Sequence, residues 1–146
     1  MKREGLDVNR PLKFMAWDRE RKEMLPVKLM DFAEWWVSCD PTYGKAKPLE
    51  YGERNSFANE ETDRHVLLEF TGLLDRDEKE AYEGHIVHQF MEVCIVRRCV
   101  GGFECEIIAG YHEGRTFSFS WLISRHCEII GHVFENPEMV GDPRRG

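Results

Sequence analysis

Eight cysteine and histidine side chains are the residues of this chain best suited to bind a metal ion. They are His85, His88, Cys94, Cys99, Cys105, His126, Cys127 and His132. Structural zinc sites usually contain a Cys-x-x-Cys pair, and this chain has none. Scattered cysteines in apolar segments are typically small core residues. We therefore expect structural roles, with no bound metal and no cofactor; a metal-dependent enzyme would need His85 and His132 to converge with a carboxylate.

A second group with chemical potential is the run of carboxylates in the middle of the chain. Its members are Asp75, Asp77, Glu78, Glu80 and Glu83. Carboxylates of this kind can hold a divalent cation, but here they alternate with Arg76 and Lys79, which is typical of a solvated turn. The chain has no glycine-rich phosphate loop and no Gly-x-Ser-x-Gly elbow. We expect no catalytic residues, so an enzyme is the weaker hypothesis.

Aromatic and basic side chains supply the candidates for partner contact. Trp17 and Trp121 lie in strand-like segments, so we expect both rings in the core. Two adjacent tryptophans cannot both face one core from a single element, which leaves one for contact with a partner. An Arg-Arg pair beside exposed aromatic rings would also suit a nucleic acid. The candidate partner-binding residues are Trp35, Trp36, His85, Arg97 and Arg98.

The composition of the chain narrows the classes of function. Its 146 residues include 32% charged and 42% hydrophobic residues, with a formal net charge of −7. Nonspecific nucleic-acid binding depends on summed positive charge, so the acidic balance argues against it. No apolar run reaches the ~20 residues of a membrane span, and the polar start lacks the apolar core of a signal peptide. We expect a cytosolic protein whose five cysteines are reduced thiols.

The N-terminal part of the chain predicts a hairpin followed by irregular structure. Apolar runs at 12–18 and 24–27 flank a charged turn, which indicates a hairpin over 12–28 with Pro26 on an edge strand. Residues 31–37 favour a short helix capped by an aspartate, although a short strand also fits. The segment 38–64 is rich in proline, glycine and polar residues and is expected to be a variable loop region, functional, disordered or concealing a short element.

The segment 65–137 predicts the core of the fold. It combines short strands with glycine turns, including Gly101-Gly102 and Glu113-Gly114. Ile86 to Val100 is nearly continuous in β-forming residues, and alternation over 116–121 predicts one buried face that carries Phe117, Phe119 and Trp121. The expected fold is a single mainly β (α+β) domain over 1–146. It is a small antiparallel, SH3-like, partly open barrel with an N-terminal hairpin and one short helix.

Three separated segments resemble the YopX family of phage and prophage proteins. They are Leu12-Lys-Phe-Met-Ala-Trp-Asp18, the central Phe70-Thr-Gly-Leu-Leu-Asp with Tyr82-Glu-Gly-His-Ile-Val87, and Glu128-Ile-Ile-Gly-His-Val-Phe-Glu-Asn-Pro137. Their order and spacing resemble the family over most of the chain. The resemblance implies a phage or prophage origin, a mainly β structure with some helix, self-association, and no established biochemical activity.

This chain departs from the family pattern at three positions. Glu78 stands where a glycine is usual, so we expect a different backbone geometry in that turn. His85 stands in place of an aspartate, and any capping of the turn by that carboxylate is lost or changed. His132 replaces an asparagine. The sequence provides no physical account of the two added imidazoles.

These observations favour a non-catalytic, phage- or prophage-encoded binding protein that contacts a host or phage protein in the bacterial cytoplasm. Self-association is a further expectation. The alternative is a nucleic-acid-binding regulator, since small barrels often serve that role, although fold alone is only an analogy. A metal-dependent enzyme is the third hypothesis.

Overall fold

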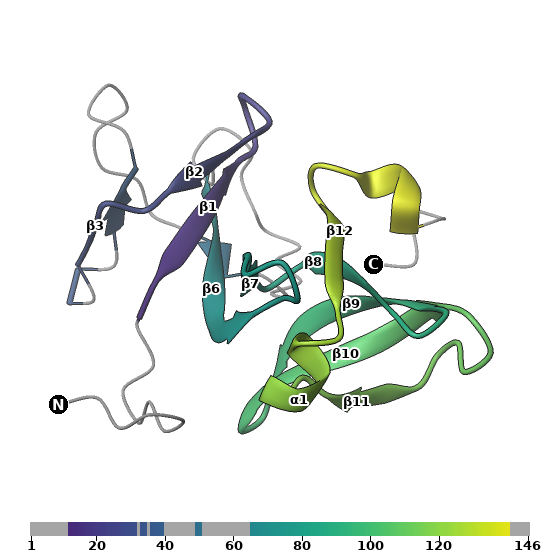
Figure 1. The fold of residues 1–146 in the computed structure, drawn as a ribbon. Coiled ribbons are helices and arrows are strands. Elements are labelled where there is room, and N and C mark those ends of the chain that lie inside the picture. Colours follow the sequence, from purple (N-terminus) through teal and green to yellow (C-terminus); the bar gives the residue numbers. More distant parts are fainter. Residues whose placement is uncertain (1–11, 32, 35, 40–48, 51–64, 141–146) are drawn as a thin grey trace, which may run out of the picture.

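A computed structural model describes residues 12–31, 33–34, 36–39, 49–50 and 65–140 of this chain, and they form mainly β-strands (Figure 1). In chain order the strands are β1 (Phe14–Asp18), β2 (Glu23–Pro26), β3 (Leu29–Asp31), β4 (Trp36–Ser38), β5 (Leu49–Glu50), β6 (His65–Leu74), β7 (Glu80–Tyr82), β8 (His85–Gln89), β9 (Glu92–Cys99), β10 (Gly102–Ala109), β11 (Thr116–Ser118) and β12 (Glu128–His132). Among the described residues the one α-helix is α1 (Trp121–Ser124), and the 3-10 helix η1 (Pro137–Val140) follows β12. No described helix has the length and apolar character that crossing a membrane requires.

The N-terminal sheet has the order β2-β1-β6-β5, and β7 pairs with β6. The predicted N-terminal hairpin is confirmed, because β1 and β2 pair antiparallel with Met15 opposite Pro26. Pro26 lies on an edge strand, as its missing N–H requires. The expected loop region 38–64 does contain a short element: β5 pairs with β6 in parallel, with Leu49 opposite Val66.

The helix predicted over 31–37 is wrong, because β3 and β4 form a two-stranded hairpin there. The Asp31 carboxylate accepts hydrogen bonds from the amides of Ala33 at 2.8 Å and Glu34 at 2.9 Å. A helix N-cap makes the same kind of bond, and aspartate uses it equally well to close a turn. The capping residue was therefore recognised correctly, but the element it caps was not.

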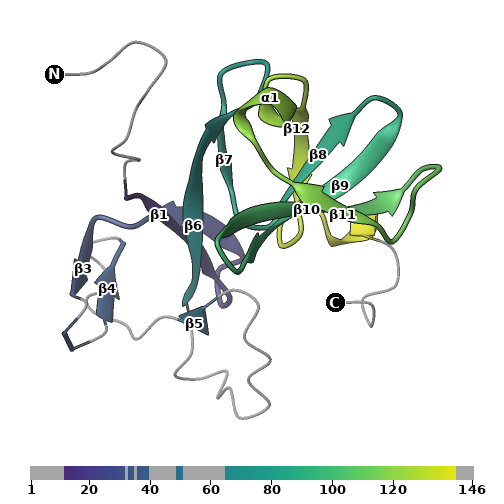
Figure 2. The same ribbon diagram turned by 90° about the horizontal axis from the view of Figure 1, so that it is seen from below.

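The C-terminal sheet has the order β11-β10-β9-β8-β12 and curls into a half-barrel (Figure 2). The predicted fold class, mainly β with a partly open antiparallel barrel, is thereby confirmed. On β10, Phe103, Cys105 and Ile107 alternate into the interior, as their spacing predicts. They join a hydrophobic cluster with Cys94 and Phe119. The Gly101-Gly102 turn connects β9 to β10 as expected.

Two features of this half-barrel differ from the prediction. The apolar run 86–100 is not continuous, because Phe90 and Met91 form a tight turn between β8 and β9. The buried face predicted for 116–121 ends at Phe119, which is 5% exposed, whereas Trp121 is 61% exposed. Ser120 interrupts the alternation, because its hydroxyl accepts a hydrogen bond from the Ile123 amide at 3.3 Å and caps α1.

Candidate functional site

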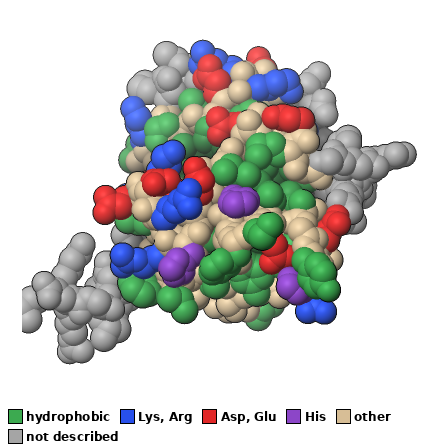
Figure 3. All heavy atoms as spheres, turned by 45° about the vertical axis from the view of Figure 1, so that its right-hand side comes forward, with side chains coloured by type: hydrophobic (Ala, Val, Ile, Leu, Met, Phe, Trp, Pro, Cys, Tyr) green, Lys and Arg blue, Asp and Glu red, His purple; other side chains and the backbone are tan. Residues whose placement is uncertain are grey.

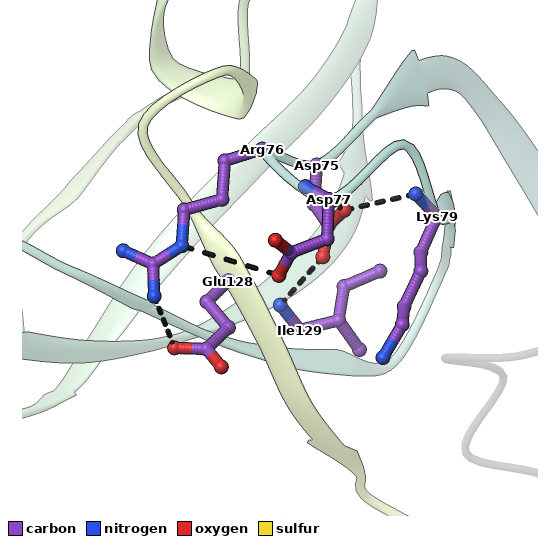
Figure 4. Close-up of polar contacts among 6 residues, drawn as sticks. All are labelled: Asp75, Arg76, Asp77, Lys79, Glu128 and Ile129. Atoms are coloured by element: carbon purple, nitrogen blue, oxygen red, sulfur yellow. Dashed lines mark hydrogen bonds and ion pairs between the residues drawn. The ribbon is translucent and has the colours of Figure 1, made fainter.

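The turn between β6 and β7 is built around one buried carboxylate (Figure 4). Asp75 is 4% exposed, and its Oδ1 accepts hydrogen bonds from the amides of Asp77 and Lys79, each at 2.9 Å. Its Oδ2 accepts a hydrogen bond from the Ile129 amide on β12 at 3.0 Å. The expected solvated turn is therefore wrong for Asp75, whose carboxylate oxygens already accept main-chain hydrogen bonds, and also for Glu83, which is 2% exposed. We call Asp75, its turn and their contacts with β12 the clasp.

Two further contacts of Arg76 complete the clasp. The Arg76 amide donates to the Cys127 carbonyl at 2.9 Å, and Nη2 forms an ion pair with Glu128 Oε2 at 2.6 Å (Figure 4). β12 is an edge strand of the C-terminal sheet, and an uncovered edge exposes main-chain donors and acceptors. The clasp covers part of this edge and ties the N-terminal sheet to the half-barrel.

Glu78 closes this turn in an unusual backbone conformation. Its φ is +64°, in the left-handed region that favours glycine, and its amide donates to the Asp75 carbonyl at 3.0 Å. Holding a residue with a side chain in this left-handed backbone conformation destabilises the fold by about 1 kcal/mol or somewhat more. The glutamate thus adopts a backbone that a glycine takes easily, and the bonds to Asp75 hold it there.

The two histidines that depart from the family pattern lie against each other. The rings of His85 and His132 are 5.1 Å apart between centroids and nearly perpendicular, at 80°. His85 Nδ1 accepts a hydrogen bond from the Tyr82 amide at 2.8 Å, which closes the tight turn between β7 and β8. His85 thus supplies the turn acceptor that a carboxylate at this position would supply.

His132 is held by main-chain groups on both sides of its ring. The Phe134 amide donates to Nδ1 at 3.2 Å, so the hydrogen lies on Nε2, which donates to the Glu83 carbonyl at 2.8 Å. Burial, together with His132, lowers the pKa of His85 to about 3. Burial lowers the pKa of His132 to about 4, although the bond to Glu83 opposes the shift. Both rings are neutral near pH 7.

This histidine pair is poorly suited to bind a metal ion. Three of the four ring nitrogens already form hydrogen bonds with the main chain. In the described part of the chain, no three His, Cys, Asp or Glu side chains lie close enough to hold an ion. None of the five cysteines forms a disulfide bond, and burial raises the pKa of Cys94 to about 12 and of Cys127 to about 11. Protonated, buried thiols are weak ligands and weak nucleophiles.

The histidine pair lies within a series of aromatic contacts that spans both sheets. Its rings, in order of contact, are Trp17, Phe134, His132, His85, Tyr82 and Phe70. Successive centroids lie between 5.1 Å and 6.1 Å apart. Trp17 is 8% exposed, which confirms its predicted place in the core. These contacts and the clasp make the junction of the two sheets a structural centre.

Of the residues predicted to contact a partner, the structure describes the side chains of His85, Arg97 and Arg98. Arg97 Nε lies 3.1 Å from Glu106 Oε2, and Arg98 Nη1 lies 3.7 Å from Glu69 Oε2. His85 belongs to the internal junction. Trp36 is part of β4, with its side chain outside the described atoms, and Trp35 lies outside the described residues. Their roles in partner contact stay predictions.

The structure reveals a different set of exposed apolar side chains on the half-barrel: three lie at the β8–β9 and β10–β11 connections, and two lie on α1, which follows the opposite end of β11 (Figure 1). Its members are Phe90, Met91, Tyr111, Trp121 and Leu122, which are 68%, 92%, 95%, 61% and 61% exposed, respectively. We call this set the tip surface. Figure 3 shows this side of the molecule, where hydrophobic side chains gather with histidines over the C-terminal sheet.

Contacts between neighbouring side chains connect the parts of the tip surface. His126 follows α1, and its ring packs on Phe90 with 6.0 Å between centroids. The His112 amide donates to Glu92 Oε2 at 3.0 Å, which ties the β10–β11 connection to the hairpin that carries Phe90. In both ribbon views the β8–β9 and β10–β11 connections lie side by side (Figures 1 and 2).

The centre of the tip surface is a strained turn. Phe90 has φ +47° and Met91 has φ +129°, both in the region that favours glycine. Two-residue hairpin loops with positive φ usually carry Asn-Gly, because bulky residues are strained there. The sequence does not predict this turn, because Phe90 and Met91 extend the apolar run and are not typical turn residues. The unusual backbone is visible only in the structure.

Comparison with known proteins identifies a family and a fold. The family model described as YopX protein matches residues 13–140. A crystal structure of protein EF1440 from Enterococcus faecalis is similar, with 22% sequence identity and a TM-score of 0.57. The similarity covers 90% of this chain and 99% of that chain, and at this identity it shows the fold alone. A search of the curated proteins finds no match.

Proposed function

This chain belongs to the YopX family, and from that premise we propose that it is a phage- or prophage-encoded, non-catalytic binding protein. Its partner is a host or phage protein in the bacterial cytoplasm, and the tip surface is the contact region. The observation that supports this proposal is the strained turn that holds Phe90 and Met91 in solvent.

The strain argument rests on what folding alone would select. A two-residue hairpin loop of this geometry forms most easily with Asn-Gly, and a bulky residue in such backbone costs on the order of 1–3 kcal/mol. Burying Phe90 and Met91 would offset that cost, yet they are 68% and 92% exposed. A gain outside folding, such as burial against a partner, therefore best accounts for these residue types.

The composition of the tip surface fits a protein partner. Aromatic side chains with few rotatable bonds are the usual anchors of protein interfaces. Arg125 lies over the Trp121 ring at 4.8 Å, which leaves the aromatic face flanked by a cation. An apolar surface of this kind suits a partner that offers an apolar pocket bordered by carboxylates.

A nucleic-acid partner is the second candidate, and one observation favours it. The exposed rings of Phe90, Tyr111 and Trp121 could each stack on a base. The charges argue against it, because the chain carries a formal net charge of −7 and Arg97 and Arg98 each lie beside a carboxylate. We therefore place it second.

A pull-down from host lysate with three versions of the protein distinguishes these candidates. The double substitution Phe90→Asn with Met91→Gly replaces the strained pair with the residues that the turn favours. Val100→Asn is the matched control, since Val100 is fully exposed in the hairpin turn at the other end of β9. We expect one partner protein, retained after nuclease treatment, with the wild type and with Val100→Asn, and its loss with the double variant.

Two other results of the pull-down would contradict the proposal. Enrichment that disappears with nuclease would favour the nucleic-acid candidate. Equal capture by the double variant and the wild type would exclude the tip surface as the contact region. Circular dichroism and a melting curve on each variant establish that the fold is intact, and we expect the double variant to melt no lower than the wild type.

A further inference from the structure

A second feature, separate from the tip surface, is an open groove in the N-terminal half. It lies between β1, the β2–β3 connection and β7, and has a volume of about 480 Å³. Phe14, Val27 and Met30 contribute to its apolar wall, and Tyr82 borders it from β7. This volume falls within the ~300–1,000 Å³ of typical small-molecule sites.

The main chain on one wall of this groove offers no donor to a ligand over three consecutive residues. Pro26 has no N–H, the Val27 amide donates to the Phe14 carbonyl at 3.2 Å, and the Lys28 amide donates to the Ser38 carbonyl at 2.9 Å. A peptide that adds as a strand is recognised through such main-chain groups. This wall therefore suits a ligand that is recognised by apolar contact and charge instead.

The charged side chains of the groove favour an anion. Lys13, Lys28 and Glu80 line it, and Glu80 is already engaged, because Lys13 Nζ lies 2.6 Å from Oε2 and the Tyr82 hydroxyl donates to Oε1 at 3.4 Å. Lys28 is exposed at the rim. Because Lys13 and Glu80 offset each other, Lys28 leaves the groove with one net positive charge, in a chain whose formal net charge is −7.

We propose that this groove binds a single-chain amphipathic anion, an alkyl carboxylate, with its chain along the apolar wall and its head group at Lys28. Exposed Leu12 and Leu29 extend the apolar wall at the rim, at 61% and 63% exposure. The chain length of the ligand is limited by the length of the groove, because carbons beyond it return to water.

The test is calorimetric titration of the full chain with alkyl carboxylates of six to twelve carbons, each below its micelle concentration. We expect affinity to rise by about two- to four-fold per added methylene until the groove is filled, and then to level off. Lys28→Glu should weaken dodecanoate binding about five-fold and strengthen dodecylamine binding. Arg115→Glu is the matched control, with the same change of charge on an exposed residue of the half-barrel.

Three results would overturn the proposal. The first is no binding of any chain length, the second is equal binding of dodecylamine and dodecanoate by the wild type, and the third is an equal effect of Arg115→Glu and Lys28→Glu. Binding to neutral and to anionic vesicles is measured as well, because a groove that docks on a membrane surface would bind vesicles but not the monomeric carboxylate. Leu29→Ser, also exposed, should reduce the gain per methylene without changing the preference for an anion.

Discussion

Three turns in the described residues place non-glycine side chains in left-handed backbone, at Lys22, at Glu78 and at Phe90-Met91, and the last two turns have opposite surroundings. In the clasp, Glu78 has φ +64° and sits beside buried Asp75, whose carboxylate holds the amides of the turn. In the tip, Phe90 and Met91 have φ +47° and +129°, and one short main-chain bond, from Met91 N to Gln89 O at 2.9 Å, is formed within the turn.

The difference shows how strain can be interpreted. In the clasp, hydrogen bonds to a charged group, each contributing about 1.5–3 kcal/mol, exceed the cost of one left-handed residue. The strain there is a by-product of a bond network that joins two sheets. At the tip no comparable network offsets it in the described residues, so the strained residue types point to a use outside folding. The following predictions test this contrast.

The largest expected effect is the removal of the carboxylate in the clasp. Asp75→Ala leaves the amides of Asp77, Lys79 and Ile129 without their acceptor, and we expect a loss of about 4 kcal/mol in unfolding free energy. Denaturant titration measures it. The matched control is Asp77→Ala, whose side chain is 53% exposed and whose loss should stay within about 0.5 kcal/mol. Equal losses for both variants would show that the clasp does not join the sheets.

The next largest effect is a loss of folding stability in acid, caused by the histidine pair beside the clasp. The pKa values of folded His85 and His132, about 3 and about 4, lie below the unfolded value of 6.5, so the unfolded chain binds more protons between these limits. Stability is therefore fully present above pH 6.5 and falls as the pH drops towards 4. From pH 6.5 to pH 5 the two groups together should remove about 3 kcal/mol.

A double variant isolates this contribution. In His85→Asn with His132→Asn each amide can accept or donate in place of the ring, but neither side chain titrates. We expect unfolding free energies measured at pH 6.5 and pH 5 to differ much less than in the wild type. His88→Asn, at an exposed position of β8, should keep the wild-type slope. A slope unchanged in the double variant would assign the acid sensitivity to other groups.

The sequence predicts the parts of this fold that repeat and misses the parts that depend on distant partners. The alternation of Phe103, Cys105 and Ile107 fixes one face of β10, since neighbouring side chains of a strand point to opposite sides. Asp75 could not be recognised as buried, because its acceptor role involves Ile129, which lies 54 residues along the chain. Long-range partners of this kind leave no local pattern.

The candidate surface was missed for a local reason. The alternation predicted Trp121 on a buried face, but β11 ends at Ser118, Ser120 caps α1, and the Trp121 ring is exposed. The Phe90-Met91 turn lacks glycine, asparagine and aspartate, so it reads as part of a strand. Residues that violate local preference are the ones sequence reasoning places wrongly, and such violations gather at functional positions.

Relief of strain at the tip should give a smaller change of opposite sign. Phe90→Asn with Met91→Gly introduces the residue types that a positive-φ hairpin loop favours, so we expect a gain of about 1–2 kcal/mol in unfolding free energy. Val100→Asn, at the fully exposed turn beyond β9, should change it by less than about 0.5 kcal/mol. A loss of stability in the double variant would mean that Phe90 and Met91 contribute to folding, and the contrast between the two turns would fail.

The smallest expected change in unfolding free energy comes from relieving the backbone strain in the clasp. Glu78→Gly removes the steric cost at φ +64°, but it also gives the unfolded chain more freedom, so the net gain should be only about 0.5 kcal/mol. Glu78→Ala removes the carboxylate and keeps the strain, so its unfolding free energy should match the wild type. If Glu78→Ala stabilises the protein as much as Glu78→Gly, repulsion among the carboxylates of this turn is the cause. Stabilisation by glycine alone would show that the clasp holds Glu78 in a backbone that its side chain opposes.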